Sequence, residues 1–492
     1  MKNFILSIDQ GTTSTRAVLF DNDGNLCHIA QKEVELKYRK PGWVEVDAIE
    51  IWLSTIDVVN EVLIKGSVSF DEIDSIGITN QRETTVVWDK KTGMPVHPAI
   101  VWQSNQTQYI CDEASIHSEL IRSKTGLPLN PYFSATKIRF ILDNIPNGQK
   151  RAQDGELMAG TIDSWLLYRI TKEKSFFTDI SNASRTLLFN IHTKAWDTEL
   201  LALFDIPIHM LAEVKSSSYS FGVASFFGCN VPICGIAGDQ QASLFGHACF
   251  EKGESKNTFG TGCFMLLNTG EVPCYSKNGL ITSIGWDLDG KTTYVLEGSV
   301  FVGGAAVQWL RDELQVIVTV DESEDYAFES DKQHEIFVVP AFTGLGAPYW
   351  DSLAKGAIFG LGRDTSKNDI IRATLEAIAY QSKDVFHAME KDADMIIKNL
   401  CVDGGAAKNN YLLQFQADIL NIPISRPVCY ENTALGVCFL SGLHTGFFSD
   451  LDAIRKLKKT SITFEPSFNK AKISNYYKQW KTAIKAVRMF KK

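Results

Sequence analysis

Two Gly-Thr-rich segments contain the residue types that bind phosphate groups. Residues 9–16 read DQGTTSTR and residues 257–262 read NTFGTG, and each lies between apolar runs that favour strands. Glycine leaves backbone amides accessible, hydroxyl groups can bond phosphate oxygens, and the Asp9 carboxylate could hold Mg²⁺ through water. Either segment taken singly is more typical of an ordinary β-hairpin, so the phosphate interpretation depends on the rest of the chain.

Three further segments place polar residues directly after apolar runs. Residues 402–410 (VDGGAAKNN) follow a predicted strand and open a helix, where glycine lets a ligand approach the backbone or simply shapes the turn. Asp239 and Gln240 follow VPICGIAG, a position that commonly meets a cleft, although an Asp there can equally cap a helix. Arg82 and Glu83 could bind neighbouring hydroxyl groups, and a surface ion pair is the plainer alternative.

One phosphate-binding pattern in the sequence is misleading. Residues 285–292 read GWDLDGKT and match the P-loop pattern letter for letter. A P-loop needs a strand before it and a helix after it, yet the strand-forming residues TTYVLEG follow here. We therefore predict a hairpin turn at Asp289 and Gly290 rather than a P-loop.

The elements that must position these residues alternate between strand and helix patterns. Apolar residues 4–8 and 16–20 flank the first Gly-Thr turn and predict a hairpin. Asp47 is expected to cap a helix that ends at Gly66. The hairpin pattern returns at residues 257–267, so we predict two halves of one architecture, with mixed sheets of the α/β class and a boundary near residue 246. The basic, helix-patterned segment 472–492 is expected to be a solvated surface helix.

Composition limits the class of protein. The 492 residues predict two or three domains, and 45% hydrophobic with 22% charged residues is typical of a globular chain. A net charge of −9 argues against a broad nucleic-acid-binding surface. Since no apolar run reaches the roughly 18 residues that span a bilayer, we expect a cytoplasmic protein with no membrane span. The ten cysteines include no CxxC pair and are expected to be reduced, mostly buried thiols.

In combination, these segments resemble the FGGY family of carbohydrate kinases from Ile5 to about Phe447. The resemblance lies in the strings IDQGTTSTR, NQRET, PYFSATK, TDISNASRTLLFNIHT, GIAGDQQA, NTFGTGCF, EGSVFVGGAAVQWLRDEL, FTGLGAPYW, VDGGAAKNN and TALG. It implies two domains of the actin and Hsp70 type of ATPase, residues 1–246 and 247–492. Each would be a ribonuclease H-like mixed sheet of five strands with helices, and the two would close over a central cleft.

The resemblance also implies an activity, the transfer of a phosphoryl group from ATP to glycerol with Mg²⁺. Asp239 would be the catalytic base, and Asp9 and Asp239 would hold the metal. Glycerol would contact Arg82, Glu83, Trp102, Tyr132, Asp239, Gln240 and Phe264. ATP would contact Thr12, Thr13, Ser14 and Arg16 on one side and Thr261, Gly304, Gln308, Gly405 and Asn409 on the other.

Other functions stay open at this point. Within the family, the acceptor could be another polyol or a ketose, and outside it an actin-like ATPase that needs no acceptor is the rival. The family carries an Arg pair after the equivalent of Gln103, whereas this chain has Ser104, Asn105 and Gln106, which puts a local charge contact in doubt. By resemblance we expect a homo-oligomer, either a dimer or a tetramer.

Overall fold

The computed structural model describes residues 2–330 and 336–490. Its strands are β1 (Phe4–Gln10), β2 (Ser14–Phe20), β3 (Leu26–Glu33), β4 (Leu36–Lys37), β5 (Glu45–Val46), β6 (Ile73–Asn80), β7 (Thr85–Asp89), β8 (Ala99–Ile100), β9 (Leu157–Thr161), β10 (Phe177–Asp179), β11 (Phe189–Asn190), β12 (Ala195–Trp196), β13 (Glu213–Lys215), β14 (Ser218–Val223), β15 (Pro232–Gly238), β16 (Ser255–Phe259), β17 (Cys263–Gly270), β18 (Ile281–Leu288), β19 (Lys291–Val300), β20 (Phe337–Val339), β21 (Ala357–Phe359), β22 (Leu400–Asp403), β23 (Ile424–Pro427) and β24 (Thr460–Phe464).

The α-helices are α1 (Ala48–Gly66), α2 (Gln108–Glu113), α3 (Ser118–Thr125), α4 (Ser134–Asn144), α5 (Gly148–Gln153), α6 (Ile162–Ile170), α7 (Ile180–Ala183), α8 (Thr198–Leu203), α9 (Asp239–Gly246), α10 (Gly304–Asp312), α11 (Glu322–Phe328), α12 (Lys367–Ala393), α13 (Asn410–Leu420), α14 (Asn432–Thr445), α15 (Leu451–Leu457) and α16 (Lys470–Met489). Single turns of 3₁₀ helix are η1 (Phe70–Glu72), η2 (Ser115–His117), η3 (Ile208–Met210), η4 (Ser225–Phe227) and η5 (Gly405–Lys408).

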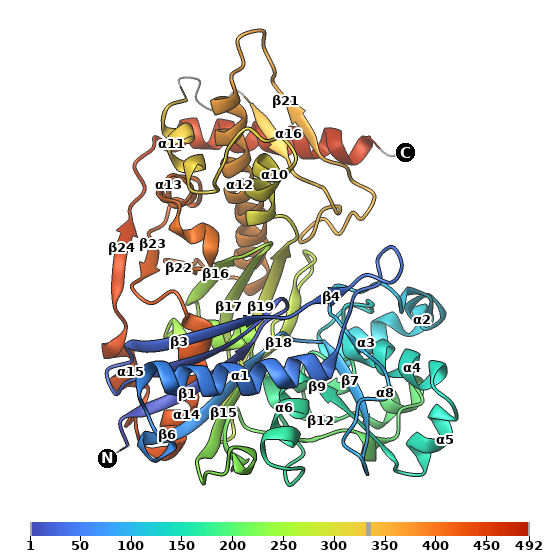
Figure 1. Ribbon diagram of the computed structural model, residues 1–492. Coiled ribbons are helices and arrows are strands. Elements are labelled where there is room, and N and C mark those ends of the chain that lie inside the picture. Colours follow the sequence, from blue (N-terminus) through green and yellow to red (C-terminus); the bar gives the residue numbers. More distant parts are fainter. Residues whose placement is uncertain (1, 331–335, 491–492) are drawn as a thin grey trace.

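The first large sheet has the strand order β14-β15-β6-β1-β2-β3 (Figure 1). The predicted hairpin is confirmed, because β1 and β2 are antiparallel with Asp9 opposite Arg16. Strands β6 and β15 then run parallel to β1, so their carboxyl ends meet at one edge with the end of β1. Helix α1 is capped by the Asp47 side chain as predicted.

The second large sheet repeats this arrangement in the order β18-β19-β17-β16-β22-β23-β24. Its central strands β19-β17-β16 are antiparallel, and β22 and β23 run parallel to β16, as β6 and β15 do to β1. Both sheets therefore contain the expected mixed core of five strands. Strand β14 extends the first core, and β18 and β24 extend the second.

The turn between β18 and β19 confirms that the P-loop match was misleading. The two strands are antiparallel, and Asp289 and Gly290 connect them with positive φ angles of 51° and 84°. These angles fit the two-residue hairpin turn that an Asp-Gly pair favours. The segment therefore has no helix N-terminus that could receive a phosphate.

The two faces of the first sheet pack against different helices. Leu6 and Ile8 of β1 point into a core that includes α1 and α6. Ile5 points to the other face of the sheet and belongs to a core that includes α14. This alternation follows from the two-residue period of a strand. Helix α14 thus comes from the second half of the chain and covers the first sheet, as Figure 1 also shows.

Helices α9 and α14 cross closely at two glycines. A Cβ atom on Gly436 would lie 1.9 Å from the Ala242 carbonyl oxygen, and one on Gly246 would lie 2.1 Å from that of Asn432. Neither distance is possible for a real side chain, so glycine is required at both positions. The helix that begins at Asp239 is therefore held directly against the second half of the chain.

The C-terminal helix differs from its prediction. Helix α16 is not simply a solvated surface helix, because Ile473, Trp480, Ile484 and Val487 are buried in the core of the second half. The Trp480 ring stacks on Tyr380 with centroids 5.2 Å apart. Most of its lysines are exposed, whereas Lys481 bonds to the buried Asp384 carboxylate, so the helix is amphipathic.

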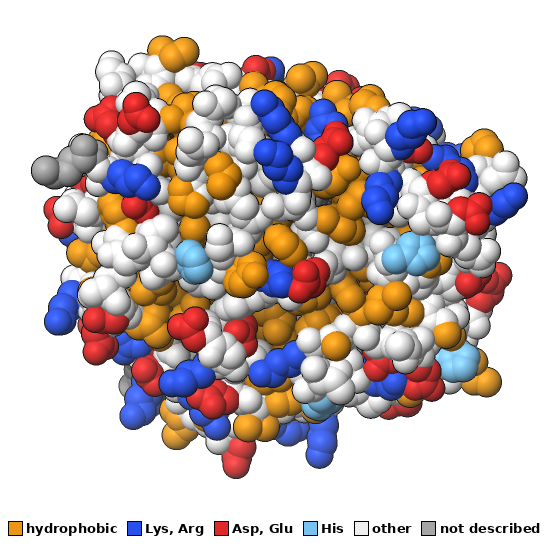
Figure 2. Space-filling view, turned by 90° about the horizontal axis from the view of Figure 1, so that it is seen from below, with side chains coloured by type: hydrophobic (Ala, Val, Ile, Leu, Met, Phe, Trp, Pro, Cys, Tyr) orange, Lys and Arg blue, Asp and Glu red, His pale blue; other side chains and the backbone are white. Residues whose placement is uncertain are grey.

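The remaining composition-based predictions concern surface and cysteines. Within the described part of the chain, no helix is both long and apolar enough to cross a membrane. Figure 2 shows basic and acidic side chains intermixed on the face seen from below, without a broad basic area. All ten cysteines are free, and most are buried, as predicted.

Candidate active site

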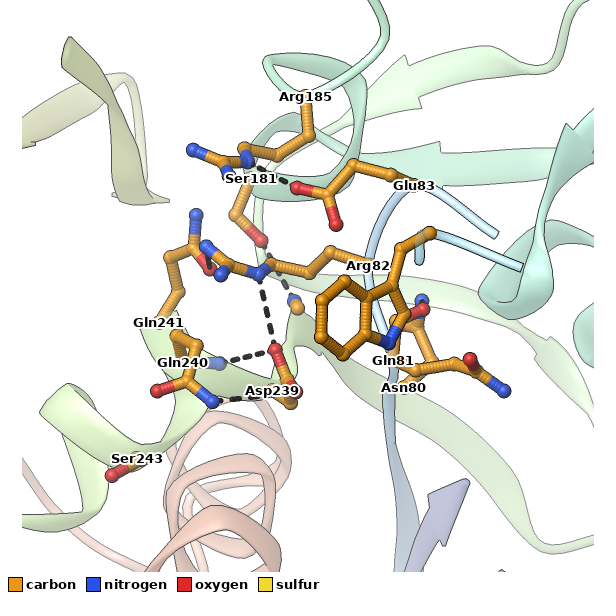
Figure 3. Close-up of polar contacts among 12 residues, drawn as sticks. Asn80, Gln81, Arg82, Glu83, Ser181, Arg185, Asp239, Gln240, Gln241 and Ser243 are labelled. Carbon is orange, nitrogen blue, oxygen red and sulfur yellow. Dashed lines mark hydrogen bonds and ion pairs between the residues drawn. The ribbon is translucent and has the colours of Figure 1, made fainter. Parts of the chain in front are cut away.

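Asp239 begins α9 directly after β15, at the edge where β1 and β6 also end. Its Oδ1 accepts the backbone N–H of Gln240 at 2.7 Å and faces Arg82 Nε at 3.1 Å. The Asp239 side chain is 29% exposed, whereas that of Arg82 is 2% exposed. A carboxylate at this position is thus oriented by buried partners while remaining open to a ligand (Figure 3).

A buried ionic network surrounds Arg82. Its Nη1 and Nη2 both donate to Glu297 of β19, and the Nη2 to Oε1 distance is 3.1 Å. Arg185 donates from Nη2 to Glu297 at 3.2 Å and from Nε to Glu83 at 2.6 Å. Burial alone would raise the pKa of Glu297, but the guanidinium groups of Arg185 and Arg82 outweigh it and lower that pKa to about 2. Glu297 is therefore ionised at neutral pH, where it accepts from both guanidinium groups.

Sequence reasoning gave no role to Arg185, Glu297 or Lys137. Each is fully buried, and each lies within a string that carries the family resemblance. Lys137 donates to the backbone carbonyl oxygens of Glu83, Tyr132 and Phe133. For Glu297 the available signal was a charged residue inside the apolar run YVLEGSV, because an ionic side chain is seldom buried without a partner.

Aromatic side chains adjoin this network. The Trp102 ring lies edge-on to Tyr132 and Phe264, with centroids 5.5 and 6.2 Å away. The Arg185 guanidinium lies 5.8 Å from the Tyr132 ring centroid, which joins the aromatic residues to the ionic ones. Together they offer apolar faces beside hydrogen-bonding groups, the combination that suits a small polyol.

Glu83 has a left-handed backbone conformation within this group. Its φ angle is 62°, a region that glycine prefers, and burial raises the pKa of its carboxyl group although Arg185 opposes the shift. The Lys137 ammonium group binds the carbonyl oxygen of the same residue at 3.3 Å. The backbone strain at Glu83 is thus stabilised by a buried donor beneath it.

A second group of predicted residues lines a pocket of about 680 Å³ in the second half of the chain. Five residues expected at a nucleotide share this lining: Thr261, Gly304, Gln308, Gly405 and Asn409. Asn409 caps α13 by accepting the Leu412 N–H at 2.8 Å and donates to Ser323 at 3.2 Å, so its side chain is fixed. The structure therefore brings these five residues together as predicted.

The first Gly-Thr turn lies apart from that pocket. Arg16 lines a neighbouring pocket of about 790 Å³, which shares Gly405 and Lys408 with the first. Thr12, Thr13 and Ser14 are on the lining of neither pocket. The contacts of Thr12, Thr13 and Ser14 with phosphate therefore stay a prediction. They require a ligand that extends beyond both pockets to this turn.

Asp9 is the predicted metal-binding residue on this turn. Burial raises its pKa to about 7, Arg16 at 3.9 Å opposes the shift, and Asp239 contributes to it by repulsion. Two carboxylates that repel each other offer the oxygen ligands that Mg²⁺ prefers, and Mg²⁺ commonly takes only one or two from the protein. In the described residues no group of three His, Cys, Asp or Glu side chains could hold a metal alone.

Comparison with known proteins identifies the family. The model of the FGGY family of carbohydrate kinases, N-terminal domain, matches residues 4–246, and that of the C-terminal domain matches residues 255–443. This chain belongs to the FGGY family. The resemblance noted in its motifs is thereby confirmed over most of its length.

Several full-length relatives of this FGGY chain are known. It is 54% identical to "Glycerol kinase" of Oceanobacillus iheyensis, over 100% of this chain and 99% of the relative. It is 52% identical to "Glycerol kinase" of Staphylococcus haemolyticus with the same coverage. Among solved structures, Plasmodium falciparum glycerol kinase with ADP matches with a TM-score of 0.92 and 36% identity, over 99% of this chain and 98% of the other.

Of the three residues expected to differ from the family pattern, Ser104 and Gln106 are buried and Asn105 is exposed. Ser104 accepts the Val44 N–H at 3.1 Å and donates to Gln106 at 2.7 Å, and Gln106 donates to Glu45 at 3.3 Å. Both side chains are thus engaged with the segment around Glu45. The neutral residues satisfy buried groups locally instead of presenting charge to the site.

Proposed function

We propose that this chain transfers the γ-phosphoryl group of ATP to glycerol and produces sn-glycerol 3-phosphate. The observation that carries the proposal is the contact of Arg82 with Asp239, beside the aromatic group of Trp102 and Tyr132. The residues predicted to bind the nucleotide line one pocket in the second half of the chain. The relatives named glycerol kinase over their full length support glycerol as the acceptor.

Each polar side chain has a role in acceptor binding. Asp239 accepts the proton of the attacking hydroxyl group, since its carboxylate is partly exposed and oriented by Arg82. Arg82 donates to a hydroxyl oxygen and Glu83 accepts from a hydroxyl group. Tyr132 and Gln240 complete these contacts, while the Trp102 and Phe264 rings pack on the carbon atoms.

The nucleotide binds between the two Gly-Thr turns. Thr261, Gly304 and the residues around Gly405 contact it from the second half, and Arg16 contacts its phosphates from the first. Asp9 and Asp239 would hold Mg²⁺, which supplies charge neutralisation for the phosphate groups. Positioning of the acceptor hydroxyl against the γ-phosphoryl group provides most of the catalysis.

We also infer the organisation in which the reaction takes place. Residues 1–246, with α14 packed on their sheet, and the remainder of residues 247–492 act as two units that close over the nucleotide and exclude water. The protein works in the cytoplasm as a homo-oligomer, a dimer or a tetramer. Light scattering of the purified protein at several concentrations distinguishes these states from a monomer.

The test is Mg²⁺-dependent release of ADP from ATP with different acceptors. Glycerol, dihydroxyacetone, xylulose and ribulose are compared with a reaction that contains no acceptor, and the phosphorylated product is identified. We expect rapid release only with glycerol, with glycerol 3-phosphate as the product. Preference for a ketose would reassign the acceptor, and equal release without an acceptor would indicate an ATPase.

A further inference from the structure

Glu297 connects the second sheet to the polar residues of the first half. It lies on β19, is 0% exposed, and accepts hydrogen bonds from both Nη atoms of Arg82 and from Arg185 Nη2. The two guanidinium groups repel each other, and a buried site screens that repulsion weakly. The Glu297 carboxylate therefore holds both arginines, and Glu83 is a second carboxylate partner of Arg185 alone.

The contact with Glu297 fixes the orientation of the Arg82 guanidinium group. A guanidinium group has a rigid fork of five N–H donors, so fixing one edge fixes the other. The outer edge of Arg82 is held by Glu297 and by Gln241, whose Oε1 lies 3.3 Å from Nη1. Only Nε faces Asp239, and it faces Oδ1 alone (Figure 3). The other oxygen, Oδ2, is thereby kept clear of the guanidinium group.

Stability alone does not explain such a cluster. The guanidinium groups of Arg82 and Arg185 contact the carboxyl groups of Glu83, Glu297 and Asp239, so five ionisable side chains are gathered here. Removing such groups from water is costly, and well-packed apolar residues often stabilise a protein as much as a buried ion pair does. A defined orientation of Arg82 is what apolar residues could not supply.

We propose that Glu297 is a positioning residue for acceptor recognition, acting through Arg82. The inference rests on the proposed function, because it assumes that Arg82 binds an acceptor hydroxyl group. Without the Glu297 carboxylate, Arg82 can turn its two Nη donors onto both oxygens of Asp239. That pairing removes the Arg82 donor from the hydroxyl group of the acceptor substrate. It also occupies Asp239 Oδ2, the oxygen that would take the proton of the attacking hydroxyl group.

The test compares glycerol with propane-1,2-diol and propane-1,3-diol in the Glu297→Gln variant, by ADP release. We expect kcat/KM for glycerol to fall about 100-fold, with KM for ATP within about twofold of wild type. For the diol that lacks the hydroxyl group bound by Arg82, kcat/KM should fall far less in this variant. Selectivity for glycerol over that diol should therefore fall about tenfold, whereas a merely structural role would lower all acceptors equally.

Two further variants control for folding. Asp384 is also a buried carboxylate of the second half, but its partners are Tyr349, Tyr477, Trp480 and Lys481, none of which is a predicted site residue. Asp384→Asn should lower the thermal midpoint without changing selectivity. Glu297→Asp keeps the charge but shortens its reach, and should give an intermediate selectivity if Glu297→Gln does not fold.

The outcomes separate this inference from the proposed function. Wild-type turnover of glycerol is measured first, and its absence overturns the proposed function. In that case the variants are compared on the acceptor that the wild type prefers and on its deoxy analogues. Unchanged selectivity in both Glu297 variants, or equal losses for every acceptor, overturns the positioning role of Glu297.

Discussion

The indole N–H of Trp102 donates a hydrogen bond to the hydroxyl oxygen of Thr12 at a distance of 2.9 Å. Thr12 belongs to the turn between β1 and β2, and Trp102 packs against Tyr132 and Phe264. The predicted phosphate turn and the predicted acceptor residues are thus joined by a single hydrogen bond.

Replacing Trp102 by Phe should therefore affect both substrates. The ring is kept, but the turn loses a donor worth about 1 kcal/mol, so we expect KM for glycerol and KM for ATP each to rise about fivefold to tenfold. Initial rates over a grid of both substrates measure this. Thr13→Val, an exposed change on the same turn, should leave KM for glycerol unchanged, and a Trp102→Phe variant with wild-type KM for ATP would contradict the coupling.

Asp239→Asn should retain acceptor binding but lose turnover. The amide keeps the size of the side chain and can still accept the Gln240 N–H, but it cannot take up a proton. General-base catalysis contributes roughly 10²–10⁴-fold, and we expect a loss in kcat of that order. Calorimetric titration with glycerol checks binding and single-turnover kinetics check the rate. Near-normal turnover would remove Asp239 from the mechanism.

Gly405→Val should act on the nucleotide alone. A Cβ atom at Gly405 meets no protein atom within 4 Å, so the fold has room for the added side chain. Gly405 lines both pockets, however, and the added methyl groups would occupy space meant for the ligand. We expect KM for ATP to rise at least tenfold, about 1.4 kcal/mol, and the thermal midpoint and KM for glycerol to stay constant. A lower thermal midpoint for Gly405→Val would show that protein atoms already fill this space, and would contradict the prediction.

Stability should depend on pH through His247 and Asp403, which lie 3.0 Å apart. Burial alone would lower the pKa of His247, but the Asp403 carboxylate outweighs it and raises that pKa above 6.5, with a smaller contribution from Cys401. The folded state then binds the proton more tightly than the unfolded state. This stabilisation is complete below pH 6.5 and is lost as the pH rises through the raised pKa.

The partner carboxylate behaves in the opposite sense. Burial opposes the shift, but His247 lowers the pKa of Asp403 to about 2, so its contribution is lost only as the pH falls toward that value. Thermal midpoints between pH 6 and about 9 should fall more steeply for wild type than for His247→Gln. His209→Gln is the matched control, because His209 contacts the Ala152 carbonyl oxygen rather than a carboxylate. Parallel curves for wild type and His247→Gln would contradict this role.

Local patterns predicted most of the elements around the site. The β1–β2 hairpin, the Asp47 cap and the Asp289-Gly290 turn depend on neighbouring residues in the chain, and all three are confirmed. Helix α16 was misjudged because its many lysines concealed an apolar stripe, and only the packing of Trp480 on Tyr380 reveals which face is buried.

Contacts between distant segments could not be predicted in this way. Arg82 and Glu297 are separated by 215 positions in the chain, and nothing in either local sequence indicates the partner of the other. The same holds for Thr12 and Trp102. Motifs named candidate site residues, of which five share one pocket, whereas the pairing among side chains follows from how the two sheets are placed.

The position of α14 has a consequence for the synthesis of the chain. The first sheet is complete at Gly238, yet Ile5, Val18 and Phe20 pack against a helix that begins only at Asn432. A nascent chain therefore carries an uncovered apolar sheet face while the segment between Gly238 and Asn432 is synthesised, and apolar surface of that kind promotes aggregation. We therefore expect the N-terminal half to be shielded by chaperones or to stay partly folded until α14 leaves the ribosome.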